Sequence, residues 1–337
     1  MIRRPHARET ARVDVLRIAA DGVERRSPDE LASLVGCGGI VWVDVPAWDD
    51  EAAAVLAQRF GIHERAAADC ARRNPVPKVH VYPGHVFVVL HAPERGARGH
   101  VHYVEVDQFV GPDWLITVHG PVNPAVRREV ALEESRAVAR RLETGRLHPA
   151  SAADLSFALV TALTGRMRDL LTVLTEEAWM LERQVTGGQG GDPEQFLEEL
   201  FAVRHGLLAV RNMATLSREV YGRMATLGVW AGPGHALLLD LEDQFRRIGA
   251  MARGQQDYLQ GVIDFYQART NTKMTIAAER LAVIAAVTLP VTALSSIVGM
   301  NVIVNDSTHV GQLVVLLTVM AVMSAMVLIW ARRKGWW

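Results

Sequence analysis

This 337-residue sequence has little cysteine and no large excess of charge of either sign. Its two cysteines, Cys37 and Cys70, belong to no motif, which excludes a fold held together by disulfides. Lysine and arginine number 36 against 37 aspartates and glutamates, so the net charge of −1 gives no electrostatic reason to expect a nucleic-acid partner. The first residues, MIRRPHARETARVDV, are charged without an apolar core, so we do not interpret them as a signal peptide.

Enzyme motifs are also missing. The glycine-rich segment TGGQGGDP, residues 186–193, lacks the Gly-Lys-Ser/Thr ending of a phosphate loop, and we interpret it as the loop of a helix hairpin. No Ser/His/Asp arrangement or nucleophile elbow stands out, so we expect neither an enzyme nor a bound cofactor. His100 and His102 point to one face of a predicted strand and would suit zinc, but no third ligand of fitting spacing exists, which favours a surface pair.

The sequence does contain two long uncharged hydrophobic runs near its C-terminus. They are residues 281–298 (LAVIAAVTLPVTALSSIV) and residues 310–330 (VGQLVVLLTVMAVMSAMVLIW). At about 1.5 Å per residue they reach roughly 27 and 31 Å, close to the thickness of a hydrocarbon core. The second run is followed by Arg332, Arg333 and Lys334, and such a basic flank anchors a helix at the cytoplasmic interface. We therefore predict two membrane-spanning helices, with both chain ends in the cytoplasm.

The chain before the membrane changes its pattern once. Residues 13 to about 120 alternate β-branched segments with an amphipathic helix, which predicts a mixed α/β domain with a sheet, and long helical patterns follow. We predict a cytoplasmic α/β domain (1–124), a cytoplasmic helical layer (125–233), a stalk helix (234–280), a pore-lining first transmembrane helix (281–301), an extracytoplasmic loop (302–309), a second transmembrane helix (310–330) and a basic cytoplasmic tail (331–337).

A heptad pattern precedes the first membrane run. Alternating spacings of four and three favour self-packing of parallel helices in a left-handed bundle, with packing against the chain's own domain as the alternative. Because the pattern leads into a membrane run, it would suit a pore built from several subunits. The positions are Leu241, Phe245, Ile248, Ala252, Gln255, Leu259, Val262, Tyr266 and Arg269.

The tripeptide Gly299-Met300-Asn301 lies where the first hydrophobic run ends. In an oligomer it would form a ring at the outer mouth, where the Asn301 amide oxygen and the Gly299 carbonyl suit a hard cation that keeps its hydration shell. The alternative is an ordinary Gly/Asn cap at a helix C-terminus. The residues alone leave both interpretations open.

The same residues resemble a known family. Gly-Met-Asn at the end of the first of two C-terminal membrane helices is the signature of the CorA family of divalent metal ion (magnesium/cobalt) transport proteins, and here it follows Pro290 by nine residues, as in that family. Four upstream segments also resemble the family's cytoplasmic domain: WVDV (42–45), FGIHERAAADC (60–70), PKVHVYPGHVFVVLHA (77–92) and WLITVH (114–119).

The resemblance implies a funnel-shaped homopentamer in the cell membrane, with an α/β sheet domain, a helical stalk and two C-terminal transmembrane helices. Its outer selectivity ring would be Gly299, Met300 and Asn301, and the ring would hold a hydrated Mg²⁺ at Asn301. An acidic residue of a regulatory metal site between subunits would fall at Asp240, with a partner acid among Asp69, Glu94 and Asp107. The pore and gate positions would be Asp264, Asn271, Thr275, Leu281, Leu289 and Thr292.

Two departures from the family pattern leave the ion open. The outer loop, VIVNDSTHV, has Asp306 as its only acid, and Thr275 stands where the family often has asparagine, with Asn271 one turn earlier. We expect influx of Mg²⁺, and also of Co²⁺ or Ni²⁺, driven by the membrane potential and gated by intracellular Mg²⁺. The alternatives are a zinc transporter of the same fold, with proton coupling left open, and a structural or sensory protein whose spans serve only as anchors.

Overall fold

The computed structural model describes residues 13–121, 123–187, 192–302 and 310–333; at positions 50, 297–302, 310, 312, 313 and 316 it describes the backbone alone. The chain divides into two compact units, residues 1–260 and 261–337, which are described separately below.

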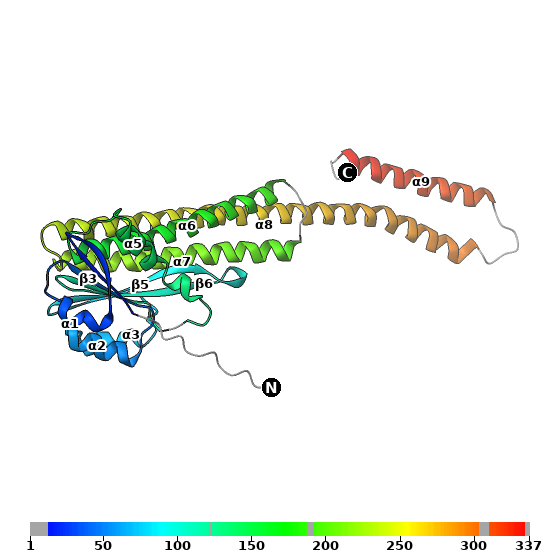
Figure 1. Cartoon of the computed structure of the whole chain (residues 1–337). Helices are drawn as coiled ribbons and strands as arrows, with labels where there is room; N and C mark the ends of the chain where they lie inside the picture. The colour runs from blue at the N-terminus through cyan, green and yellow to red at the C-terminus, as the bar shows by residue number, and fades with distance from the viewer. Residues whose placement is uncertain (1–12, 122, 188–191, 303–309, 334–337) are drawn as a thin grey trace, which may run out of the picture. The chain divides into compact units, whose positions relative to one another are not determined.

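A seven-stranded sheet forms the centre of the first unit (Figure 1), with strand order β2-β1-β3-β7-β6-β5-β4. The β3–β7 pair is parallel and the other five pairs are antiparallel. β5 and β6 are the longest strands and form a hairpin that extends along the helices (Figure 1). The strands are β1 (Asp14–Ala19), β2 (Gly22–Arg26), β3 (Ile40–Val45), β4 (Lys78–Tyr82), β5 (His85–Arg95), β6 (Val101–Val110) and β7 (Trp114–Val118).

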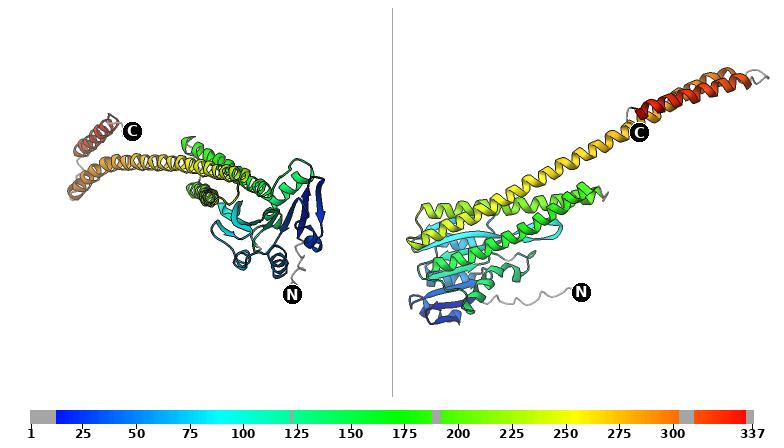
Figure 2. Two further views of the ribbon diagram at one scale, coloured as in Figure 1. Left: turned by 90° about the vertical axis from the view of Figure 1, so that its left-hand side faces the viewer. Right: turned by 90° about the horizontal axis from the view of Figure 1, so that it is seen from above.

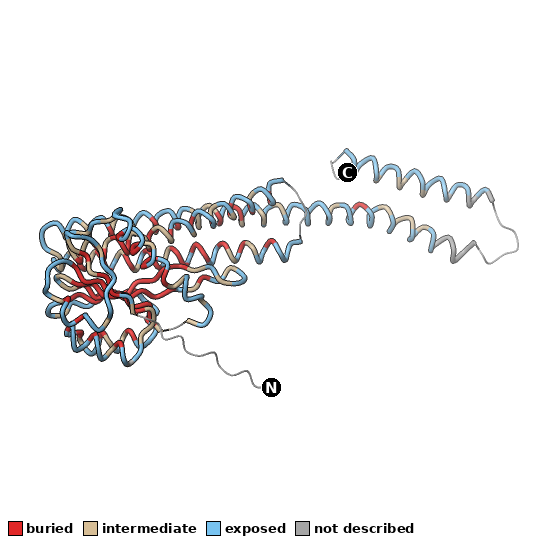
Figure 3. The backbone as a smooth tube through the Cα atoms, viewed as in Figure 1, coloured by how far each residue is buried: buried red, intermediate tan, exposed pale blue. Residues whose placement is uncertain are grey.

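Both faces of this sheet are covered, because successive side chains of a strand point to opposite faces. In β3, Val41 and Val43 pack with helices α1 to α3, whereas Trp42 packs with α5 and α6. The buried backbone follows the sheet in Figure 3. The covering elements are the short 3-10 helix η1 (Pro28–Glu30), α1 (Leu31–Leu34), α2 (Asp50–Phe60) and α3 (Glu64–Cys70) on one side and α4 (Arg128–Ala131), α5 (Glu133–Glu143) and α6 (Ala152–Gly187) on the other.

Three long helices lie side by side beyond the sheet: α6, α7 (Pro193–Thr226) and the first part of α8 (Pro233–Val302) (Figures 1 and 2). The ring of Tyr221 on α7 stacks on Phe245 of α8, with centroids 5.7 Å apart. Thr164 Oγ1 on α6 donates a hydrogen bond of 2.8 Å to Gln244 Oε1 on α8. These contacts hold the start of α8 against its own chain.

The heptad positions at the start of α8 therefore pack within the chain, and not against other subunits as we favoured. Phe245 and Ala252 are fully buried and Ile248 is 2% exposed, all within a single chain. The prediction that this stripe packs against other subunits is wrong for these residues, because α6 and α7 of the same chain already cover them. An amphipathic helix packed on its own domain gives the same periodicity.

The second unit consists of the rest of α8 and of α9 (Val310–Arg333). Helix α8 is continuous through Pro290. Beside the proline, Thr288 Oγ1 donates to the Ile284 carbonyl at 2.9 Å, and Thr292 Oγ1 donates to the Thr288 carbonyl at 2.8 Å. The long apolar side chains of this unit are mostly exposed, among them Leu281, Ile284, Leu289, Val315 and Met326.

Among the residues that the structure describes in full, one helical stretch is long and apolar enough to cross a membrane. It is Pro233–Ser296 of α8, whose best 18-residue window has a mean hydropathy of 1.6 and is 6% buried within the chain. Exposed apolar area of this extent is what a helix surrounded by lipid or by other subunits presents.

Candidate ion pathway and metal sites

Helix α8 carries the Gly-Met-Asn tripeptide in its last turn. Residues 299–301 have helical backbone and the helix ends at Val302. A capping glycine stands just beyond the last helical residue, and Gly299 lies before that position. The last four carbonyls of a helix have no partner within the helix, and in α8 these are the carbonyls of residues 299–302. The side chains of Met300 and Asn301 lie outside the described residues.

The six candidate pore positions of α8 share one helical stripe. Counted in heptads with Asp264 at position a, Asn271 and Thr292 are also at a, Leu281 is at d, and Thr275 and Leu289 are at e. All six are exposed, with Leu281 67% and Leu289 68% accessible. The a, d and e positions make up one face of a helix in a left-handed bundle.

The first part of α8 packs on its own chain through two other heptad positions. In the same count Phe245, Ala252 and Leu259 are at position c, and Leu241 and Ile248 are at position f. All five are buried. Positions c and f are centred about half a turn away from a, d and e. In the first unit, α8 therefore packs on its own domain through positions c and f, while its a, d and e side chains are mostly exposed.

Asp240, the candidate regulatory ligand, is exposed near the start of α8. Its Oδ2 accepts a hydrogen bond of 3.0 Å from Gln244 Nε2. Of its candidate partners, Asp69 forms an ion pair of 2.8 Å with Lys78, Glu94 forms one of 2.8 Å with Arg166, and Asp107 is fully buried. Within one chain, two of the three acids are already neutralised and the third is inaccessible.

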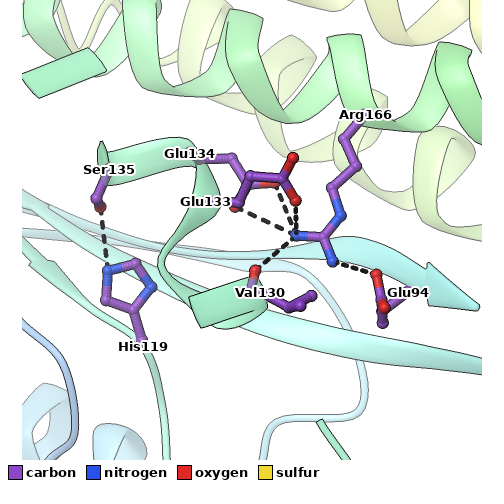
Figure 4. Close-up of polar contacts among 7 residues, drawn as sticks. All are labelled: Glu94, His119, Val130, Glu133, Glu134, Ser135 and Arg166. Atoms are coloured by element: carbon purple, nitrogen blue, oxygen red, sulfur yellow. Dashed lines mark hydrogen bonds and ion pairs between the residues drawn. The ribbon is translucent and has the colours of Figure 1, made fainter. Parts of the chain in front are cut away.

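Arg166 organises an ion-pair cluster between the sheet and the helices (Figure 4). Its guanidinium donates to Glu94 Oε2 at 2.8 Å, to Glu134 Oε1 at 3.1 Å and to the Val130 carbonyl at 3.0 Å, and it lies 3.7 Å from a Glu133 oxygen. The side chain is 11% exposed. Arg166 thus pairs with acids from β5 and α5 and links the sheet to the helices, which is a structural role.

Sequence reasoning missed a buried Ser/His/Asp group. Asp44 from β3, His119 after β7 and Ser135 from α5 meet, although they are far apart in sequence, and Figure 4 shows the His119–Ser135 part. Both Asp44 Oδ1 (2.8 Å) and Ser135 Oγ (3.1 Å) approach His119 Nε2. A hydrolytic triad needs them on opposite ring nitrogens, so this arrangement is structural.

Burial and charge shift the pKa values in this group. Burial lowers the pKa of His119, but the Asp44 carboxylate and, more weakly, Glu134 outweigh burial and hold it above its usual value. Burial raises the pKa of Asp44, but His119, Thr117 and Ser135 outweigh it and hold it below its usual value. Folding therefore favours the charged forms of both His119 and Asp44.

A second buried group lies on the other side of the sheet. Glu105 accepts from Asn74, at 2.6 Å from its side chain and at 2.8 Å from its backbone N–H. Asp107 is fully buried beside Cys70 and Glu105. Burial, reinforced by the nearby Glu105, holds the pKa of Asp107 well above its usual value. Burial thus favours the neutral form of the Asp107 carboxyl.

Metal ligands do not converge in the side-chain positions shown: among the described residues, no three His, Cys, Asp or Glu side chains form a ligand set. The structure nevertheless changes the interpretation of one pair. The rings of His100 and His102 are 4.7 Å apart, and the ring of His205 from α7 stacks on His100 at 5.9 Å. Sequence spacing gave no sign of this third imidazole, because α7 follows about one hundred residues later.

The fold thus defines a class: a sheet domain joined by one very long helix to an apolar C-terminal pair, as in membrane metal transport proteins. The family model "CorA-like Mg2+ transporter protein" matches residues 38–333 of the chain. The chain belongs to this family of divalent metal ion transporters, a family of membrane proteins with a C-terminal transmembrane region, and it is not an enzyme.

Individual relatives agree with this assignment. The Bacillus subtilis (strain 168) protein named "Putative metal ion transporter YfjQ" is 24% identical over 88% of this chain and 89% of its own length. The complete structure of the CorA magnesium transporter from Methanocaldococcus jannaschii matches with a TM-score of 0.80 at 16% identity, covering 96% of this chain and 98% of that one. The full-length CmaX protein matches with a TM-score of 0.73 at 18% identity, covering 96% and 97%. The predicted fold class is confirmed.

Proposed function

We propose that the chain forms a homopentameric channel for Mg²⁺ in the cell membrane, with both termini in the cytoplasm. In this proposal residues 281–301 line the pore, residues 302–309 form the outer loop and residues 310–330 form the outer helix. The observation that carries the proposal is the exposed a/d/e stripe of α8, which contains all six candidate pore positions.

The outer ring is proposed to select the ion. The free carbonyls at the end of α8, together with one Asn301 amide per subunit, would present neutral oxygen dipoles to the axis, and the C-terminal end of a helix adds partial negative charge. Mg²⁺ gives up its water reluctantly, so such a ring suits the hydrated ion. Gly299 would let the backbone approach the axis without a Cβ.

Leu281 and Leu289 are proposed as the gate. Rings of leucine exclude water from a narrow pore, and they conduct when the helices move apart and the constriction becomes wet. Both side chains are about two thirds exposed in the single chain, so they are available to face an axis. Intracellular Mg²⁺ bound between subunits at Asp240 would favour the closed arrangement, because it binds that state better.

The membrane potential supplies the driving force. A divalent ion that crosses 100 mV gains about 4.6 kcal/mol, twice the value for one elementary charge. Uptake of Mg²⁺, and of Co²⁺ or Ni²⁺ as similarly hydrated ions, therefore needs no nucleotide hydrolysis as an energy source.

The test is ion flux into proteoliposomes that contain a Mg²⁺-sensitive dye, under an inside-negative potential. Wild type should admit Mg²⁺, and Asn301→Ala should reduce the rate at least tenfold because it removes one amide per subunit from the ring. The matched control is Asn305→Ala, an amide four residues further on, which should keep the wild-type rate. Equal rates in wild type and Asn301→Ala would remove Asn301 from the ion path.

A zinc transporter of the same fold is the second candidate. It is favoured by an outer loop with Asp306 as its only acid and with His309 at its end, which gives little charge to concentrate Mg²⁺. The same vesicles discriminate, because a proton-coupled zinc transporter would show Zn²⁺ entry that falls when the inward proton gradient is removed. No Mg²⁺ entry together with this Zn²⁺ response would replace the first proposal.

A further inference from the structure

We infer that His100, His102 and His205 form a binding site for a zinc-class divalent ion on the first unit, remote in sequence from the pore positions. The site does not depend on the proposed ion selectivity of the channel. Imidazole nitrogen is a preferred ligand of Zn²⁺, Co²⁺ and Ni²⁺, whereas Mg²⁺ takes oxygen ligands. The site would therefore bind a transition metal ion even when Mg²⁺ is present in large excess.

The backbone holds the three histidines on one surface. The hairpin between β5 and β6 closes through a hydrogen bond of 2.7 Å from Gly96 N–H to the His100 carbonyl. Its short helix η2 (Ala97–Gly99) rests directly on α7, since a Cβ on Gly99 would come within 2.2 Å of Ala202 Cβ. His205 follows Ala202 by three residues and lies on the same side of α7.

Two of the three ring spacings suit a shared metal. A Zn–N bond of about 2.0–2.1 Å places a ring centroid roughly 3.2 Å from the metal, so two rings on one ion lie roughly 4.5–6.3 Å apart for bond angles from about 90° to 180°. The measured centroid separations are 4.7 Å for His100–His102 and 5.9 Å for His100–His205. Both fall inside this range.

In the rotamers present, the ring nitrogens of the three histidines do not converge on one point, and no ligand set is formed among the described residues. His100 and His205 are exposed and His102 is half-buried, so turning these rings between staggered rotamers displaces no core side chain. Arg98 and Arg204 are adjacent in sequence to this cluster, and their charge would weaken cation binding without preventing it.

The experiment is a titration of the full-length chain, freed of any polyhistidine tag, with Co²⁺ in the presence of a large excess of Mg²⁺. Visible absorption reports imidazole-bound Co²⁺, and Zn²⁺ should displace it. We expect one Co²⁺ per chain in wild type and at least tenfold weaker binding in His205→Ala and His100→Ala. His235→Ala, an exposed histidine at the start of α8, is the matched control and should bind as wild type does.

Two results would overturn the inference: no Co²⁺ bound to wild type under excess Mg²⁺, or unchanged affinity in both His205→Ala and His100→Ala. His205→Gln provides a second variant that keeps the helix and the side-chain size, and it should lose binding as His205→Ala does. Pore ions are distinguished by stoichiometry, because a site on the axis is shared by the subunits, and by Asn301→Ala, which should retain the histidine site in full.

Discussion

The two parts of α8 have opposite relations to the rest of the chain. In the first part, residues at c and f such as Phe245 and Ala252 have no exposed surface, because α6 and α7 of the same chain cover them. In the second part, Leu281 and Leu289 are 67% and 68% exposed, and among the described residues no element covers them. The first half of the helix is largely covered by its own chain, whereas the second half leaves most of its apolar side chains exposed, with Val283 as a buried exception.

This difference predicts that substitutions in the two parts of α8 affect two different properties, stability in the first part and ion transport in the second. Substitutions on the first part should change the free energy of unfolding of residues 13–260, since they remove packed core atoms. Substitutions on the second part should change ion flow and leave that free energy nearly unaltered. Each prediction below tests whether the two parts are as independent as the burial implies.

The largest expected effect is that of Phe245→Ala. It removes a fully buried ring that stacks on Tyr221, and it should lower the free energy of unfolding of the first unit by about 3–5 kcal/mol. Chemical denaturation followed by tryptophan fluorescence measures this. Leu239→Ala, an exposed leucine on the same helix, is the control and should cost less than about 0.5 kcal/mol. Similar losses in both variants would contradict the in-chain packing of α8.

His119→Gln should cost about 3 kcal/mol at pH 6, because it leaves the buried Asp44 carboxylate without its charged partner. The pKa of His119 is raised by folding, so its contribution is fully present below its unfolded pKa and is lost as the pH rises through the folded value. The cost should therefore be smaller at pH 9 than at pH 6. A cost that does not change with pH would show that the pair is uncharged.

Asp107→Asn should have a smaller, pH-dependent effect. The pKa of Asp107 is raised by folding, so wild type loses stability as the pH rises from the unfolded value to the folded one, by at most about 1.4 kcal/mol per pH unit. The amide cannot ionise, and the variant should lack this part of the slope. Parallel stability–pH curves for the two proteins, measured by denaturation, would mean that Asp107 is already ionised at neutral pH.

Leu289→Ala should have the smallest effect on stability, under about 0.5 kcal/mol for the first unit, because the side chain is exposed in the chain. Its effect should appear in transport, as a several-fold higher Mg²⁺ leak at high internal Mg²⁺, since a smaller side chain weakens dewetting at the gate. Vesicle flux measures the leak. A large loss of stability with no change in leak would reverse the assignment of this part of α8.

The sequence predicted the fold well, because the relevant signals are local. Alternating β-branched segments indicated the sheet, the two uncharged runs indicated the C-terminal helices, and the tripeptide at 299–301 pointed to the family that the comparisons confirm. The heptad stripe of α8 was assigned to the wrong partner, because periodicity shows that a face is covered and does not say by what.

Side-chain groups assembled from distant segments were not predictable. Ser135 reaches His119 only because α5 packs on the sheet beside β7, and His205 reaches His100 only because η2 rests on α7 at Ala202. Neither pairing leaves a spacing in the sequence. The pore positions came from the family resemblance and stay a prediction; the structure shows that they are exposed and share the a, d and e positions.

The most direct test of the central claim compares two faces of the same turn of α8. In a Cys37→Ser background, Thr292→Cys places a thiol at position a and Leu294→Cys places one at position c. A small cationic thiol reagent should abolish potential-driven Mg²⁺ entry in the Thr292→Cys channel and leave the Leu294→Cys channel unaffected. Block of the Leu294→Cys channel alone, or of neither, would contradict the claim that the exposed stripe of α8 lines the ion path.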